Sequence, residues 1–155
     1  DNEQQMDNAK STSLDSVVVE KIYLREGLVD QYAFGHGDGK WRMERINQIS
    51  FKDNVNASFL NFLQKFFAAN GAGMIRNPLP YSGPDPNGEE TSHVEWSTFL
   101  PTVPDNMIHN ILYGQKYGKS QRKILVFRGL SNGIETRLVF KQRHGKWHLE
   151  KIKAY

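Results

Sequence analysis

The chain begins with a polar segment, and the residues after it alternate between apolar and polar as in β-strands. Residues 1–13 are almost wholly polar and predict a flexible tail. Three segments rich in β-branched residues or alternating at a period of two come next: 17–24, 28–34 and 40–46. The glycine-rich stretch 35–39 predicts a hairpin turn, because glycine reaches positive φ at little cost. This part of the chain therefore predicts a three-stranded antiparallel unit.

A different period appears at 54–69, where apolar side chains recur every three or four residues. The side chains of this stripe are Val55, Phe59, Phe62, Leu63, Phe66 and Phe67. Such spacing predicts an amphipathic helix, with Ser50 and Asp53 as capping groups before it and Asn70-Gly71 as its end. An exposed stripe of this size favours aggregation. We therefore expect the phenylalanines Phe59, Phe62 and Phe66 to pack in the hollow of the closing strands.

The remaining pattern predicts short strands. All six prolines lie between residues 78 and 104, which excludes a long helix there and confines strands to short pieces. The segments with strand-like patterns are 93–100, 107–113, 123–130, 134–141 and 146–153. The predicted fold class is therefore α+β, with one long amphipathic helix packed on a strongly curved antiparallel sheet.

A self-match at an offset of 106 residues joins the two ends of the chain. Residues 24–46 align without a gap on residues 130–152, and eight of the 23 positions are identical. The identical pairs are Leu24/Leu130, Gly27/Gly133, Phe34/Phe140, Gly39/Gly145, Lys40/Lys146, Trp41/Trp147, Glu44/Glu150 and Ile46/Ile152. We interpret the segments as two copies of one hairpin. The alternative is that two unrelated hairpins converged on Gly-Lys-Trp.

The two copies differ in what precedes them, and this sets the predicted domain division. A helix precedes the second hairpin, whereas only the polar tail precedes the first. Either an upstream segment is missing or the first hairpin borrows cover from the rest of the chain, because a hairpin cannot bury its own face. The predicted division is a tail at 1–13, a three-stranded hairpin unit at 14–49 and a second unit at 50–155.

Composition and charge narrow the class of protein. Hydrophobic residues make up 38% and charged residues 24% of the 155 residues, which excludes a disordered chain. The absence of cysteine excludes disulfides and thiolate metal sites, and no apolar run is long enough to span a membrane. Residues 1–114 carry nine Lys/Arg against 15 Asp/Glu, and residues 115–155 carry 11 against two. The basic end could bind a polyanion, or it could simply neutralise the acidic remainder after folding.

Several segments together carry a resemblance to a known family. They are Phe59-x-x-Phe62-x-x-x-Phe66, Arg76-Asn77-Pro78-Leu79-Pro80, Trp96, Asn110-Ile111-Leu112-Tyr113-Gly114-Gln115, Asn132-Gly133 and Gly145-Lys146-Trp147-His148-Leu149. With these residues the chain resembles an uncharacterised family of Bacteroidetes envelope proteins that carries the nuclear transport factor two-like (NTF2-like) cone fold in tandem. The resemblance implies a tandem member truncated at its N-terminus. It further implies export to the cell envelope or periplasm, with a lipid anchor outside this chain.

No set of residues identifies a reaction. A cone-fold enzyme would need a carboxylate or histidine at the mouth of its cavity, and Glu95 with His109 is the best available pair. The neighbouring acids Asp85, Glu89 and Glu90 have the pattern of solvated loop residues. The histidines do not cluster at metal-ligand spacing, so we predict no metal, no cofactor and no catalytic residues.

Aromatic richness without a catalytic set favours a non-enzymatic binding module with a concave pocket between helix and sheet, and the resemblance implies that this module is exported. The predicted ligand-binding residues are Arg76, Tyr81, Trp96 and Tyr113, with Arg76 fixing an anionic group and the rings forming an apolar wall. The expected partner is an unknown small molecule or protein and not a nucleic acid. Free strand edges at 17–46 also allow a homodimer.

Overall fold

We describe the fold from a computed structural model, in which the described residues are 15–84, 92–98, 107–114, 120–129 and 133–155. The chain divides into two compact units that interleave along the sequence. The first unit comprises Asp1–Gln64 with Pro104–Lys119, and the second comprises Lys65–Val103 with Ser120–Tyr155. The boundaries predicted at 13/14 and 49/50 stay a prediction.

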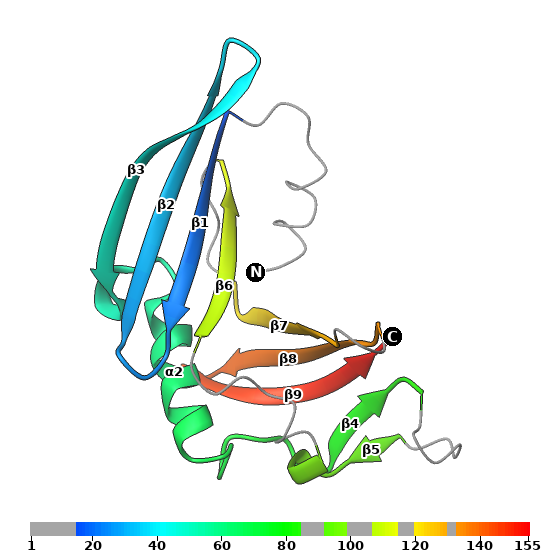
Figure 1. The fold of residues 1–155 in the computed structure, drawn as a ribbon. Coiled ribbons are helices and arrows are strands. Elements are labelled where there is room, and N and C mark those ends of the chain that lie inside the picture. Colours follow the sequence, from blue (N-terminus) through cyan, green and yellow to red (C-terminus); the bar gives the residue numbers. More distant parts are fainter. Residues whose placement is uncertain (1–14, 85–91, 99–106, 115–119, 130–132) are drawn as a thin grey trace. The chain divides into compact units, whose positions relative to one another are not determined.

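The first unit contains a four-stranded antiparallel sheet (Figure 1). Its strands, in spatial order, are β3 (Lys40–Ser50), β2 (Leu28–Gly37), β1 (Ser16–Tyr23) and β6 (Met107–Tyr113). The strands predicted from the pattern of residues 17–46 are confirmed. The strand predicted at 107–113 is also confirmed, and it pairs with β1 along its whole length.

The two faces of this sheet differ in burial on β2, β1 and β6, whereas on β3 residues 40–48 are exposed on both faces. One face, which we call the inner face, carries Glu20, Ile22, Val29, Ala33 and Ile108, all of them buried. The opposite face, which we call the outer face, carries large apolar side chains that are exposed or half-buried. They are Val17, Val19, Tyr32, Phe34, Trp41, Met43, Ile46, Met107, Ile111 and Tyr113.

The second unit contains a five-stranded sheet. Its strands, in spatial order, are β5 (His93–Val94), β4 (Leu79–Ser82), β9 (Lys146–Ala154), β8 (Glu135–Arg143) and β7 (Arg122–Arg128). β4 runs parallel to β9, so the expectation of a wholly antiparallel sheet is corrected here. The strand expected at 93–100 is also shorter, because a 3₁₀ turn at Trp96–Thr98 follows β5.

The predicted helix is confirmed as α2 (Ala57–Ala68), but it begins later than the apolar stripe. A 3₁₀ turn, η1 (Phe51–Asp53), precedes it, and the Oδ1 atom of Asn54 accepts a hydrogen bond of 2.8 Å from the backbone N–H of Asn56. Val55 therefore lies before the helix and is 77% exposed, which corrects its place in the stripe. Ser50 does not cap α2 either, because its hydroxyl donates to the carboxylate of Asp53.

The helix ends as predicted. Asn70 and Gly71 take φ values of 50° and 75°, and the Gly71 N–H donates to the carbonyl of Phe66 at 2.8 Å. Phe66 is completely buried and makes edge contacts with Phe140 of β8 and with Trp96. Its ring centroid lies 5.4 Å from that of Phe140. Packing of the helix on the closing strands is therefore confirmed at Phe66.

The other two phenylalanines named in that prediction belong to the first unit. Phe59 is 8% exposed, and its ring stacks on that of Phe62 with centroids 6.1 Å apart. The side chain of Gln64 lies in the same unit, where its amide donates to the carbonyl of Leu24 at 2.7 Å. Burial of this part of the helix therefore belongs to the core of the first unit.

The hairpins β2–β3 and β8–β9 have the same internal geometry. At the offset of 106 residues, eight of the ten cross-strand pairs of the first hairpin have their counterparts in the second, from Asp30–Gln48 with Thr136–Ala154 to the pairs at the turns. Both break register at the same place, before Phe34 and before Phe140. Both turn on two residues with positive φ, Asp38-Gly39 and His144-Gly145. Their origin as two copies of one unit stays an interpretation.

Candidate functional site

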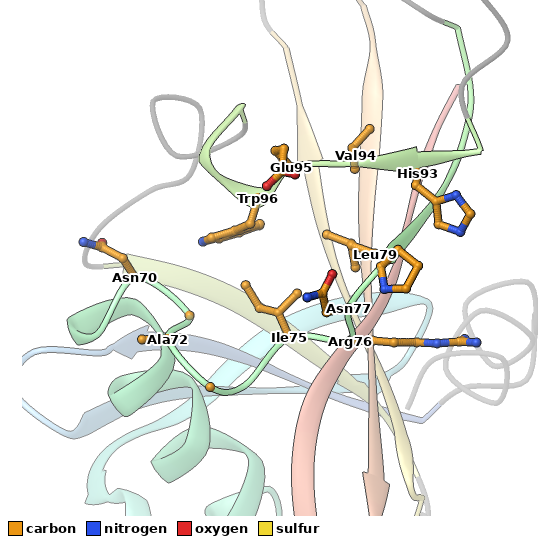
Figure 2. Close-up of a pocket in the computed structure, with 13 residues that line it drawn as sticks. Asn70, Ala72, Ile75, Arg76, Asn77, Leu79, His93, Val94, Glu95 and Trp96 are labelled. Carbon is orange, nitrogen blue, oxygen red and sulfur yellow. The ribbon is translucent and has the colours of Figure 1, made fainter.

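The second unit contains a pocket of about 490 Å³ at the end of α2 (Figure 2). Three short segments line it: the turn after the helix at 70–73, the stretch 75–79 that leads into β4, and residues 93–96 of β5 and the turn after it. Its volume lies within the range of small-molecule sites. The pocket mixes apolar walls with amide, imidazole, carboxylate and indole groups.

Two local constraints fix the course of the chain around this pocket. Gly71 is buried with a φ of 75°, and a Cβ atom there would lie 2.6 Å from the Cδ1 atom of Ile75. The next residues then pair with β9: Ile75 bridges Leu149, and the N–H of Arg76 donates to the Leu149 carbonyl at 2.9 Å. The turn and this short pairing together hold the floor of the pocket.

Trp96 closes the opposite side of the pocket. Its side chain is 8% exposed, and its ring packs against Phe66 with centroids 5.2 Å apart. The indole Nε1 atom is buried, and among the described residues no acceptor lies within hydrogen-bond distance. Figure 2 shows Ile75 and Asn77 directed toward the Trp96 ring and the indole nitrogen at the end of the ring nearer Asn70. A buried donor without an acceptor is uncommon in folded proteins and needs an explanation.

Arg76 lines the same pocket, but its guanidinium is bound elsewhere. It donates to the carboxylate of Glu150 at 3.0 Å, and in Figure 2 it extends away from Trp96. Glu150 also accepts hydrogen bonds from Arg143 at 3.1 Å and His148 at 2.5 Å. Burial raises the pKa of this carboxyl, but the hydrogen bond from His148 and the charges of Arg143 and Arg76 outweigh burial and lower its pKa below the usual value.

Glu135, the other acidic residue of the basic segment 115–155, forms a similar cluster. Glu135 accepts hydrogen bonds from Arg128 at 3.1 Å and from Arg137 at 2.7 Å. Burial raises its pKa, and the two arginines lower it by a larger amount. Glu135 and Glu150 are the only acids in residues 115–155, and each binds two arginines. Binding of a polyanion by the basic end stays a prediction.

The structure brings together two of the four predicted ligand-binding residues. Arg76 and Trp96 line one pocket. Tyr81 lies in β4, outside the described lining, and its hydroxyl donates to the Pro84 carbonyl at 2.7 Å. Tyr113 lies at the end of β6 in the first unit, paired with Val17. The set of four is therefore not one site within either unit.

The sequence analysis did not single out Asn70 and Asn77 as lining residues. Both lie in stretches with a clear local role, the helix stop and the Asn77-Pro78 peptide, which is cis. In the sequence Asn70 has the pattern of a helix stop, and Asn77 is only one member of the motif Arg76-Asn77-Pro78-Leu79-Pro80. Their side-chain amides can donate and accept, and this is the signal that could have marked them.

The alternative catalytic pair is divided between the units. Glu95 lines the pocket of the second unit, whereas His109 lies on β6 of the first. The loop acids Asp85, Glu89 and Glu90 lie outside the described residues. Within the described part of the chain, no group of three or more His, Asp or Glu side chains is placed to hold a metal ion.

The first unit holds a buried carboxylate that the sequence analysis also missed. Glu20 is completely buried, and three side-chain amides donate to it: Gln31 at 2.9 Å, Asn54 at 2.7 Å and Asn110 at 3.0 Å. These donors come from β2, from the turn before α2 and from β6. The carboxylate therefore links four segments of the unit. A glutamate alternating with apolar residues in Val18, Glu20 and Ile22 is the signal for it.

Comparisons with known proteins identify a family and a similar structure. Residues 1–154 match the family model described as a domain of unknown function (DUF4348), and the chain belongs to that family. An NTF2-like protein from Bacteroides fragilis NCTC 9343, solved by crystallography, matches with 29% identity and a TM-score of 0.72. The match covers 99% of this chain and 70% of that chain, and it supports the NTF2-like fold predicted from the sequence. The comparison with curated proteins gave no match. No helix in the described residues is long and apolar enough to cross a membrane.

Proposed function

We propose that this DUF4348 chain is a non-enzymatic binding module whose pocket, beside Trp96, takes a small molecule. The molecule has an oxygen acceptor for the indole N–H and an apolar edge. The single observation that carries the proposal is the buried Nε1 atom of Trp96, for which the described residues offer no acceptor. A buried donor without a partner costs about 1–3 kcal/mol, and a ligand oxygen removes that cost.

The lining gives the ligand its further chemistry. Ile75 and Leu79 offer an apolar surface, and the amides of Asn70 and Asn77 can donate to or accept from hydroxyl and carbonyl groups. Among the described lining residues, Arg76 alone carries a guanidinium, and it is bound to Glu150. A full charge on the ligand is therefore not required, and a neutral hydroxylated or amide-bearing molecule such as a monosaccharide fits better than a dianion.

The test uses the indole N–H of Trp96 as its reporter. The ¹H–¹⁵N spectrum of the chain contains three indole N–H signals, from Trp41, Trp96 and Trp147, and substitution by phenylalanine assigns each. We expect at least one member of a panel of glucose, galactose, N-acetylglucosamine and N-acetylmuramic acid to shift the Trp96 signal. Its shift to lower field reports a new acceptor.

Trp96→Phe keeps a ring against Phe66 and removes only the donor. We expect it to weaken binding of the active compound about tenfold, since a hydrogen bond in a buried site is worth roughly 1.4 kcal/mol. Trp41→Phe, in the first unit, is the matched control and leaves the affinity unchanged. If every compound leaves the Trp96 signal in place, or if Trp96→Phe binds as tightly as the parent, the proposal is wrong.

We also propose that the protein is exported to the cell envelope or periplasm and anchored by a lipid outside this chain. The family resemblance carried by the sequence motifs supports this proposal. Fractionation of cells that make the natural protein tests it, with the expected result in the envelope fraction. A homodimer through a free strand edge at 17–46 stays a prediction, which sedimentation of the chain can test; β3 is the edge strand of that segment in the described sheet.

A further inference from the structure

The second unit gathers the positive charge of its three long strands, β7, β8 and β9, on one face of the sheet (Figure 1). Paired residues on neighbouring strands point to the same side, so the register assigns each cation to a face. Of the nine lysines and arginines in these strands, only Lys123 lies on the face of Phe140, which packs against α2. The other eight lie on the opposite face, which we call the basic face: Arg122, Arg128, Arg137, Lys141, Arg143, Lys146, Lys151 and Lys153.

The bulge in β9 brings the lysines of this strand together. Lys146 and Lys151 are five residues apart, and in an unbroken strand their side chains would point to opposite faces. The register shifts at Glu150, which has no paired residue on β8, and the alternation of faces is reversed after it. Lys151 and Lys153 therefore share the face of Lys146.

The acids of the basic face neutralise only part of its charge. Glu135 and Glu150 each bind two arginines. Within the described residues, no carboxylate forms an ion pair with any of the four lysines of the face, Lys141, Lys146, Lys151 and Lys153. The face therefore keeps an excess of positive charge that the described part of the chain does not balance.

The cations crowd most closely around Lys151. Burial lowers the pKa of its ammonium, and the charges of Lys153 and Arg122 lower it further, against an opposing effect of Glu150. Val139, the partner of Lys151 on β8, is 2% exposed although it lies on the basic face. Lysine and arginine stems can cover such a residue while their charged ends reach water. Positive groups from β7 and β9 therefore converge over the middle strand.

The first hairpin shows that this scaffold does not itself require the cations. At the offset of 106 residues, Lys141 and Arg143 correspond to Gly35 and Gly37. Like charges gathered on one face repel one another and oppose folding. An anionic ligand would relieve that repulsion, and this gives the concentration of charge a reason other than stability.

We propose that the basic face binds an extended anionic polysaccharide, whose carboxylate or sulfate groups contact the four lysines. Neighbouring strands lie about 4.8 Å apart, and alternate residues of one strand lie about 6.8 Å apart. The cations therefore form a grid, and a chain with one anionic group on each sugar can contact several of them at once. This inference goes beyond the pocket beside Trp96 and does not depend on it.

The aromatic content of the face favours a polysaccharide over a single-stranded nucleic acid. Proteins hold single-stranded nucleic acids on several stacking rings beside their cations. Among the described residues of the basic face, Tyr155 carries the one phenol or indole ring. That ring is 61% exposed and lies 4.9 Å from the guanidinium of Arg137. One ring can support a sugar, but it does not form a row for successive bases.

Calorimetric titration of the intact chain tests the proposal with three polysaccharides. Polygalacturonate carries one carboxylate on each sugar, heparin carries sulfate as well, and dextran is neutral. We expect the two anionic chains to bind and dextran not to bind. The affinity for polygalacturonate is expected to fall at least about tenfold between about 50 and 200 mM salt, because binding releases counterions.

Two double variants locate the contact. Lys146→Gln with Lys151→Gln removes two charges from the basic face, and we expect it to weaken polygalacturonate binding about tenfold. The matched control, Lys40→Gln with Arg45→Gln, removes two charges at the corresponding positions of the first hairpin. It is expected to change the affinity less than about threefold.

A single variant separates binding from a structural role. Lys151→Gln removes an ammonium that burial and its neighbours disfavour, so we expect weaker binding without a lower melting temperature. Trp96→Phe is expected to bind polygalacturonate as the parent does, which keeps this test distinct from that of the pocket.

Three results would overturn the proposal. Neither anionic polysaccharide could bind at low salt, or the two double variants could weaken binding equally, which would show that only net charge matters. The third is tighter binding of single-stranded DNA than of polygalacturonate, because the face would then be a nucleic-acid surface.

Discussion

The hairpins β2–β3 and β8–β9 share register, bulge and turn, yet one exposes the side chains that the other buries. The side chain at the position of the bulge, Glu44 or Glu150, shows the same division. Glu44 is exposed on the first hairpin, whereas Glu150 is 9% exposed and binds Arg76, Arg143 and His148. The strand pattern therefore sets the pairing of a hairpin, and the neighbours that pack on it decide how much each residue contributes to stability.

The largest difference is expected at the paired phenylalanines. Phe140→Ala removes a completely buried ring and its contact with Phe66, and we expect it to lower the free energy of unfolding by about 3–5 kcal/mol. Phe34→Ala removes a half-buried ring and is expected to cost about 1 kcal/mol. Urea unfolding of both variants measures the difference. Equal losses would mean that the outer face of the first hairpin is covered in solution.

The bulge glutamates give the next largest difference. Glu150→Ala leaves three donors without their common acceptor, although two of them are more than half exposed and can be hydrated. We expect a loss of about 1–2 kcal/mol in the free energy of unfolding. Glu44→Ala is expected to stay within about 0.5 kcal/mol of the parent, because that side chain is exposed. Thermal unfolding at neutral pH distinguishes the two variants. Comparable losses of stability would mean that the two glutamates contribute equally, which would contradict this prediction.

Glu150 also predicts how the stability of the chain changes in acid. Because the pKa of Glu150 is lowered in the folded state, its contribution to stability is complete above the unfolded-state pKa and is lost as the pH falls through the lowered pKa. Glu150→Gln is therefore expected to flatten the fall in stability below about pH 4.5, as the lowered pKa of Glu150 requires. The measurement is urea unfolding at a series of pH values from about 6 to 2.5. Parallel curves for the parent and Glu150→Gln would contradict this account.

The smallest effect concerns the turns. His144 and Asp38 occupy the same turn position with a φ of 51° in both hairpins. Asparagine and aspartate tolerate this conformation better than histidine does. We expect His144→Asn to stabilise the chain by about 0.5 kcal/mol and Asp38→Asn to have almost no effect. Differential scanning calorimetry resolves such a difference, and a destabilised His144→Asn would show that the imidazole has another role.

Much of the local structure followed from the chain's own pattern. The apolar stripe and the Asn70-Gly71 stop predicted α2 and its end, and β-branched runs with glycine turns predicted the strands of both hairpins. The helix start was predicted too early because the spacing of an apolar side chain fits both a helix and the turn before it. Val55 has the spacing of the helix stripe, but the Asn54–Asn56 hydrogen bond keeps it before the helix.

The candidate site was less predictable than the elements. Trp96 and Arg76 were found because of their residue type, but sequence could not show that Glu150, 74 residues away from Arg76, would bind its guanidinium. Nor could it show that Tyr113 pairs with Val17 in the first unit. These pairings depend on which distant strands become neighbours, and local propensity carries no information about that choice.

The sequence alone determined where the helix, the turns of the two hairpins and most of the strands form, because periodicity, β-branching and positive-φ residues act within a few positions of the chain. Only the tertiary structure decided that Trp147 is buried and Trp41 exposed, that Glu20 is held by three amides, and that the indole of Trp96 lacks an acceptor. Burial and hydrogen-bond satisfaction depend on segments brought together from far apart, so equal sequence patterns can meet different surroundings.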